Sequence, residues 1–139
     1  MSEPVRIEVP GVPVGKGRPR FSRKSGHAYT PEKTASYEAV VKFFAAQEMA
    51  GRTPLTGPLA VQVHAYMPIP ASWSKKKQQQ ARAMALMPIT KPDLSNIAKA
   101  AEDPLNNVVW GDDSQIVRLS MSKAYSDEPR LVIMVEPLA

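Results

Sequence analysis

Apolar and polar residues alternate with a period of two in four segments of the chain, which is the pattern of half-buried β-strands. The predicted strands cover residues 5–9, 59–67, 115–123 and 130–135. Helical spacing between them predicts three helices. The first runs from a cap at Thr30 to about residue 49. The second covers about residues 75–86 after a cap at Ser72 or Ser74, and the third runs from a cap at Asp93 to about residue 103.

The order of elements is therefore strand, helix, strand, a small basic helix, helix, strand and strand, which predicts an α+β protein. A length of 139 residues is typical of one domain, so residues 1–139 are expected to form a single domain. Trp73 and Trp110 are expected in its core. Proline between the elements, as at positions 10, 13 and 104, limits the strands and helices that it adjoins.

The third predicted helix separates apolar from polar residues. At about 100° per residue, one side carries Leu94, Ile97, Ala98, Ala101 and Leu105. The other side carries Asn96, Lys99 and Asp103, within about 60° of one another. Pro104 cannot donate its amide to a helical hydrogen bond, so the helix is expected to stop or kink near Asp103.

The chain has a formal net charge of +5, which favours a polyanionic partner, with nucleic acid as the leading candidate. The absence of cysteine excludes disulfides, thiolate catalysis and cysteine-ligated zinc, and it is compatible with a cytoplasmic location. The first residues lack the apolar core of a secretory signal, and no apolar run approaches the roughly 20 residues that span a bilayer. No membrane association is expected.

Four aspartates in a short region are candidate ligands for Mg²⁺, the metal that assists hydrolysis of phosphodiesters. They are Asp93, Asp103, Asp112 and Asp113. Lys99 among them could stabilise the negative charge of a phosphoryl transition state. Taken by spacing alone, the pattern also fits an interpretation without function, because aspartate is common at helix caps and in turns.

Basic residues gather in two further places that could contact DNA phosphates. The first is a glycine-containing segment that we expect to be an irregular loop, and the second is the start of the small basic helix. The candidates are Lys16, Arg18, Arg20, Arg23 and Lys24 in the loop, and Lys75, Lys76 and Lys77 in the helix. A solvated basic loop and a solvated helix face are the alternatives.

Several motifs are distributed over most of the chain. They are Lys91-Pro-Asp-Leu-Ser-Asn-Ile-Ala-Lys99, Asp103, Trp110-Gly-Asp-Asp-Ser-Gln-Ile116, and the stretches at 13–23, 29–34, 72–77 and 123–125. Together these motifs resemble the RusA family of Holliday-junction resolvases, many of them prophage-borne. The resemblance implies a small mixed β-sheet packed by helices, a homodimer, and Mg²⁺-dependent nicking of four-way DNA junctions in recombination and repair. Mn²⁺ is the alternative metal, and no organic cofactor is implied.

Carried over residue by residue, the resemblance places Asp93 and Asp113 on the family's catalytic, metal-binding aspartates and Lys99 on its active-site lysine. The chain departs from the family at Ser95, where a second aspartate is usual. A hydroxyl is a weaker Mg²⁺ ligand than a carboxylate. Either Asp112 or Asp103 compensates, or the protein binds junctions and cuts them poorly, or the natural protein has another residue there.

Three classes of function therefore stay open. The first is a metal-dependent endonuclease that resolves four-way junctions by two symmetric nicks, for which a two-fold homodimer supplies two identical sites. Apolar residues at Val40, Val41, Phe43 and Phe44 exceed what one helical stripe needs and are candidates for the dimer contact. The second is a junction-binding protein without strong catalysis, and the third is a basic globular protein with another acidic partner.

Overall fold

The computed structural model of the protein describes residues 3–17, 20–21, 28–29 and 32–139. Its main sheet contains β1 (Val5–Pro10), β4 (Leu59–Pro68), β5 (Ile116–Ser126) and β6 (Arg130–Pro137), in the order β1-β6-β4-β5. β6 pairs antiparallel with β1 and β4, whereas β4 and β5 run parallel. The predicted small mixed sheet is confirmed.

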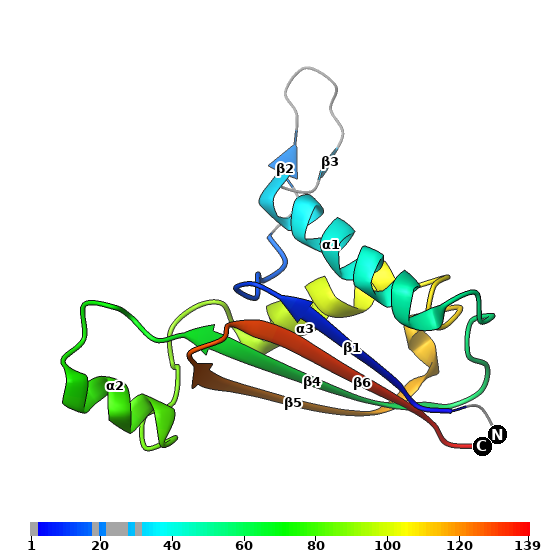
Figure 1. Cartoon of the computed structure of the whole chain (residues 1–139). Coiled ribbons are helices and arrows are strands. Elements are labelled where there is room, and N and C mark those ends of the chain that lie inside the picture. The colour runs from blue at the N-terminus through cyan, green and yellow to red at the C-terminus, as the bar shows by residue number, and fades with distance from the viewer. Residues whose placement is uncertain (1–2, 18–19, 22–27, 30–31) are drawn as a thin grey trace.

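The helices are α1 (Glu32–Met49), α2 (Lys75–Arg82) and α3 (Leu94–Glu102). α1 and α3 lie on the same face of the sheet, and α2 lies beyond the end at which β4 and β5 finish (Figure 1). Parallel neighbours need a crossover connection, and the segment between β4 and β5, which includes α2 and α3, provides it. Both parallel strands therefore end beside the loops that flank these two helices.

The core fills the space between the sheet and the two covering helices. Alternate residues of β4 are buried, as are alternate residues of β1, as the period-two pattern predicts. α1 contributes Val41 and Ala45, and α3 contributes Ile97, Ala100 and Ala101. Each large apolar side chain that is fully buried stabilises the fold by about 1.5–3 kcal/mol. The inner face of α3 is thereby fixed against the sheet, and its polar face is left outward.

Three sequence predictions about elements need correction or have limits. α2 ends at Arg82 instead of residue 86, because the chain turns at Met84, whose φ is 63°. The segment 15–24, expected to be an irregular loop, contains the short strand β2 (Arg20–Phe21), which pairs antiparallel with β3 (Ala28–Tyr29) beyond it. Aromatic residues such as Phe21 and Tyr29 favour extended backbone. The predicted cap at Thr30 lies outside the described residues.

The two tryptophans differ in their surroundings. Trp110 is fully buried and donates a hydrogen bond from Nε1 to Oδ1 of Asn106 at 2.8 Å, which confirms it as a core residue. Trp73 is only partly buried, so its predicted place in the core is wrong. It packs edge-on against Tyr125, at the end of the sheet next to α2. In the part of the chain that the structure describes, no helix is long and apolar enough to cross a membrane.

Candidate active site

Asp93 occupies the cap position at the start of α3, yet its carboxylate makes no capping hydrogen bond. The backbone carbonyl of Asp93 accepts the hydrogen bond from Ile97 N at 3.0 Å that begins the helix. The side chain is exposed. The local interpretation of Asp93 as an ordinary helix cap is therefore not supported, and its carboxylate is available for another ligand.

Lys123, on β5, fixes the loop that leads into α3. Its Nζ donates hydrogen bonds to the backbone carbonyls of Thr90 at 2.9 Å and Pro92 at 3.1 Å. These two residues flank Lys91, and Pro92 immediately precedes Asp93. The sequence pattern does not reveal this role, because the partners are about thirty residues away along the chain. Lys123 therefore positions the backbone from which Asp93 projects.

The segment before β2 also packs against the start of α3. The backbone N–H of Lys16 donates to the carbonyl of Asn96 at 2.9 Å, and that of Gly17 donates to Oγ1 of Thr34 at 2.9 Å. A Cβ atom at Gly15 would lie 2.6 Å from Cβ of Pro92, which is closer than real carbon atoms approach. Glycine at position 15 is thus what permits this close packing beside Asp93.

Lys16 lies between two carboxylates. Its Nζ forms an ion pair with Glu38 on α1 and another, at 3.1 Å, with Asp103 at the end of α3. Burial alone would lower the pKa of Lys16, but the hydrogen bonds to Glu38 and Asp103 raise it above its ordinary value. Lys16 thus ties the segment to both helices. Its predicted contact with DNA stays a prediction.

Lys99 is exposed on the outer face of α3, together with Asn96, whereas Asp103 is partly buried. The separation of this polar face from the buried Ile97, Ala98 and Ala101 confirms the helical periodicity predicted from sequence. Leu94 is only partly buried, and Ala100 joins the buried set. Lys99 follows Asp93 by six residues, which corresponds to about 9 Å along the helix axis.

Glu102 is a site residue that the sequence reasoning missed. Burial raises the pKa of its carboxyl group, the negative charge of Asp113 raises it further, and the positive charge of Lys99 partly opposes this increase. Asp103 adds a smaller increase. Glu102 comes three residues after Lys99 and so lies on a neighbouring part of the helix surface, a signal that could have identified it. The last turn of α3 and Asp113 thus form an acidic cluster.

Asp112 and Asp113 have different roles. The carboxylate of Asp112 accepts a hydrogen bond from Ser114 N at 3.0 Å. Hydrogen bonding to the side chain and the backbone of Ser114 lowers the pKa of Asp112. Asp112 therefore caps the 3₁₀ turn Asp113–Gln115, as the local interpretation of this aspartate expects. Asp113 is partly buried beside Glu102.

Gln115 holds this turn in place through hydrogen bonds of both its side-chain oxygen and its side-chain nitrogen. Its Oε1 accepts from the N–H groups of Gly111 at 2.9 Å and Asp112 at 3.1 Å. Its Nε2 donates to the carbonyls of Leu55 at 3.0 Å and Gly57 at 3.1 Å. The turn that carries Asp113 is thereby attached to the segment leading into β4. Gln115 is a positioning residue for Asp113.

The predicted metal ligands do not converge within one chain. Asp93 begins α3 and Asp103 follows its last residue, so about 15 Å of helix rise separates them. Asp113 lies at the same end as Glu102. Among the described residues, no three histidine, cysteine, aspartate or glutamate side chains are arranged to hold one metal ion. Within one chain the four predicted aspartates therefore do not form one cluster, and their assignment as metal ligands stays a prediction.

A cleft of about 890 Å³ opens beside Asp93. Its lining comes from the segment before β2, the first turn of α1, the ends of β4 and β5, and the loop before α3. The lining residues that matter below are Lys33, Met67, Thr90, Lys91, Asn96 and Tyr125, together with five prolines. The start of α3 thus has free space next to the exposed carboxylate of Asp93.

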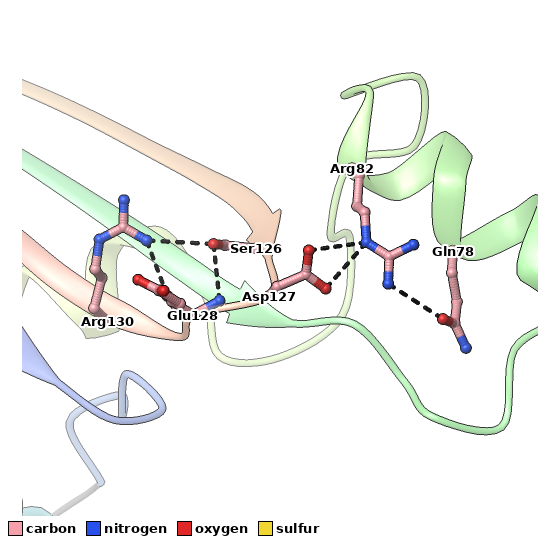
Figure 2. Close-up of polar contacts among 6 residues, drawn as sticks. All are labelled: Gln78, Arg82, Ser126, Asp127, Glu128 and Arg130. Carbon is pink, nitrogen blue, oxygen red and sulfur yellow. Dashed lines mark hydrogen bonds and ion pairs between the residues drawn. The ribbon is translucent and has the colours of Figure 1, made fainter.

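α2 is attached to the main sheet beside this cleft. Arg82 donates through Nε to the carboxylate of Asp127 at 3.0 and 2.9 Å, and its Nη2 donates to Gln78 at 3.4 Å (Figure 2). Figure 2 also shows the turn from β5 into β6 that carries Asp127. The predicted small basic helix is thereby held at the end of the sheet. This contact also gives the basic N-terminus of α2 a defined place.

Apart from Lys16, the basic residues predicted to bind DNA fall into three groups. Lys75 and Lys76 are exposed at the start of α2, which Ser74 caps. Lys77 lies 4.1 Å from the centre of the Trp73 ring, a cation–π contact. Arg18, Arg23, Lys24 and the side chain of Arg20 lie outside the described residues. The structure thus places the lysines of α2 and leaves their contact with DNA a prediction.

Two comparisons with known proteins find similarity along most of the chain. The family model described as "Endodeoxyribonuclease RusA" matches residues 10–136, which is most of the chain. The chain is also 40% identical to a protein of Bacillus subtilis (strain 168), named "Uncharacterized protein YqaN", over 97% of each chain. The matched region includes both ends of α3, the turn with Asp113, and Lys123.

Proposed function

Because the chain belongs to the RusA family of endodeoxyribonucleases, we propose that it resolves Holliday junctions by metal-dependent hydrolysis of DNA, with Asp93, Asp113 and Lys99 as its catalytic residues. The observation that carries the assignment of residues is the carboxylate of Asp93, which stands at a helix start without a capping bond. A carboxylate that is held in place but has no structural task is suited to bind a ligand.

The donor set fits Mg²⁺, because this ion prefers carboxylate oxygens and water. Bound by these carboxylates, Mg²⁺ would activate a water molecule and neutralise charge on the scissile phosphate. Lys99 would stabilise the additional negative charge that develops on the phosphoryl oxygens. Asp93 would supply a carboxylate to the ion from the start of α3, and Glu102 and Asp113 would supply carboxylates from its other end. Asp103, held by Lys16, has less freedom to do so.

The separation of Asp93 from Asp113 favours a site shared between two copies of the chain. α3 and β5 run in opposite directions, because Pro92 lies beside Lys123 and Asp113 lies just before the first residue of β5. Each chain alone therefore carries two incomplete sets of ligands. A homodimer in which the start of α3 faces Asp113 of the partner subunit would complete both.

β5 is the surface that best suits such a pairing. Among the described strands it has a neighbour on only one side, β4, and its Val117 and Leu119 are 65% and 41% exposed. Antiparallel pairing of two β5 strands about a two-fold axis would bring opposite strand ends together. The start of α3 in one subunit would then lie near Asp113 of the partner subunit. The exposed Val40 and Phe43 of α1 are the alternative contact, whereas Val41 is buried in its own core.

Ser95 supports a second candidate function, binding of junctions with weak cleavage. Its hydroxyl is exposed in the first turn of α3, two residues after Asp93, where it offers a neutral oxygen in place of a charged one. Glu102 is an additional carboxylate at the other end of the helix and could restore the lost charge in a shared site. Conversion of Ser95 to aspartate separates the two functions, since a poorly active protein should gain cleavage strongly.

The proposed function is tested with a synthetic four-way junction and a plain duplex of the same sequence. Purified protein should nick opposite strands of the junction when Mg²⁺ or Mn²⁺ is present and should leave the duplex intact. Asp93→Asn should reduce cleavage by at least about a hundredfold while junction binding persists, and Glu136→Gln, an exposed acid on β6, is the matched control. Binding without cleavage by the wild type would support the second function. Equal affinity for junction and duplex would exclude both.

A further inference from the structure

We propose that the cleft beside Asp93 binds one unstacked nucleotide of the DNA strand that is cut, so that this part of the protein reads the sequence at the cleavage point. The inference rests on the proposed function, because it places a DNA strand at Asp93. It adds a binding site for a base, which the catalytic residues themselves do not provide. The cleft, the chemistry of its lining and its position next to Asp93 carry it.

An aromatic and a thioether side chain among the lining residues of the cleft are suited to contact a base. Met67 of β4 and Tyr125 of β5 are partners in the parallel pair, and both line the cleft. Aromatic rings stack on bases of any kind, and thioethers pack well against them. Tyr125 is held in place edge-on by Trp73, with ring centres 5.3 Å apart. The ends of the two parallel strands therefore form a fixed stacking surface.

Most of the remaining apolar lining consists of prolines, whose rings keep a fixed shape before a ligand binds. They are Pro13, Pro68, Pro70, Pro88 and Pro92. Proline has a fixed φ and no N–H group, so its ring presents apolar surface without an unpaired donor. Lys123 holds one wall through the carbonyls of Thr90 and Pro92. A cleft that is largely preformed loses little free energy in ordering itself around a ligand.

Polar groups at the rim suit the other parts of a nucleotide. Lys33 and Lys91 are exposed there, and in the described part of the chain neither forms an ion pair. Their charges match a phosphate, and the exposed amide of Asn96 can donate and accept at a base edge. Asp93 lines the same cleft. A base inside therefore places its own phosphate beside the candidate catalytic carboxylate.

Only an unstacked nucleotide fits this description, because stacking in a duplex covers both faces of the base and pairing occupies its edge. The branch point of a four-way junction provides such nucleotides at a lower cost than a continuous duplex does. A base in the cleft thus links recognition of the branch with selection of the phosphate to be cut.

The test uses junctions in which each nucleotide near the branch is replaced in turn by an abasic residue. Affinity of the wild-type protein is measured in EDTA, and a denaturing gel confirms that the strands stay intact. Removal of the base at one position, on two opposing strands, should weaken binding about tenfold or more, because stacking on an aromatic ring is lost. Other positions should change affinity little.

Two variants connect that position with the cleft. Thr90→Trp fills the cleft, and the backbone carbonyl that Lys123 contacts is unchanged, so this variant should bind intact and abasic junctions equally. Ile89→Trp is the matched control, because Ile89 is 92% exposed and lies outside the cleft lining, and it should retain the discrimination. Tyr125→Leu keeps apolar bulk without the ring and should reduce the discrimination several-fold.

Two results would overturn the inference in distinguishable ways. If the wild type binds junctions tightly but no single base matters, or if Thr90→Trp discriminates as the wild type does, the nucleotide site is excluded and the proposed function stands. If junctions bind no more tightly than duplex at the same salt concentration, the proposed function fails and the nucleotide site fails with it.

Discussion

The ammonium group of Lys123 lies 3.1 Å from the carbonyl oxygen of Pro92, so the edge strand β5 directly holds the residue that precedes Asp93. A second bond to Thr90 at 2.9 Å makes the attachment bidentate. The position of Asp93 therefore depends on the sheet as well as on α3. A side chain that positions a candidate metal-binding residue through hydrogen bonds commonly affects activity more than stability.

Substitution Lys123→Met should reduce the rate of junction cleavage about 10- to 100-fold, because the loop before Asp93 loses both hydrogen bonds. Junction affinity should fall much less than the rate. Single-turnover cleavage at saturating protein separates the two effects. Arg6→Met, an exposed residue of β1 at the opposite edge of the sheet, is the control, and an equal loss of rate in both variants would show that Lys123 has no special positioning role.

Mixing two inactive proteins tests the site shared between subunits. In a mixed dimer of Asp93→Asn and Asp113→Asn chains, one of the two shared sites keeps both aspartates, whereas sites within single chains would all lack one. A mixture refolded together should therefore recover about a quarter of wild-type nicking, because about half of randomly paired dimers are mixed and each has one active site. The cuts should fall on one strand of each junction. No recovery would place the complete site within one chain.

Gly15→Ala should destabilise the protein by about 1–3 kcal/mol, because the added methyl group would overlap Pro92. The displacement reaches the loop before Asp93, so cleavage should weaken as well. Thermal unfolding followed by circular dichroism measures the first effect. Gly11→Ala provides a comparison, since its Cβ would meet no atom within 4 Å but its φ of 99° is strained for alanine. Unchanged unfolding of Gly15→Ala would contradict the close packing.

Lys16→Met distinguishes a structural lysine from one that binds DNA. Removal of the ammonium leaves the carboxylates of Glu38 and Asp103 without their partner, and these side chains are only 18% and 30% exposed. We expect a loss of about 1–3 kcal/mol in stability. The dependence of junction affinity on salt should stay as in the wild type. A decrease of about one in the slope of log K against log salt would instead assign Lys16 to a phosphate contact.

Glu102 makes the stability of the metal-free protein depend on pH. Its pKa is raised in the folded state, first by burial and then by Asp113, so the folded protein binds this proton more tightly than the unfolded chain does. The contribution of Glu102 to stability is therefore fullest below the unfolded pKa, ordinarily about 4.3, and is lost as the pH rises through the higher folded value. Glu102→Gln should raise the melting temperature at pH 7 in EDTA and have little effect at pH 4. Equal effects at both pH values would contradict the raised pKa.

The elements that depend on short-range patterns were predictable. Alternation along residues 59–67 and the helical spacing of Ile97, Ala98 and Ala101 identified β4 and the buried face of α3 correctly, because period-two and helical patterns follow from local geometry. Pro104 likewise marked the end of α3, where a 3₁₀ turn begins at Asp103. The outward position of Lys99 on α3 follows from the same helical spacing, so it too was predictable from the sequence.

Relations between distant parts of the chain were not predictable from one sequence. Gln115 contacts Leu55 and Gly57 across about sixty residues, and the sheet order β1-β6-β4-β5 sets neighbours that are far apart in the chain. The spacing of the aspartates suggested one cluster because it gave no measure of distance through the fold. Glu102 was overlooked because its surroundings depend on Asp113, which another turn brings to the end of α3.

A substitution in the cleft and a substitution in the core differ in their effect on the stability of the fold. The stacking surface of the cleft is formed by strand ends, but most walls of the cleft are the segment before β2 and the loops on either side of α2, where side chains such as Thr90 and Lys91 are exposed. Substitutions there can alter the shape and polarity of the cleft without disturbing the sheet. Members of the family that share this framework could therefore diverge in the DNA sequences they prefer through a few loop residues, with the catalytic carboxylates and the fold retained.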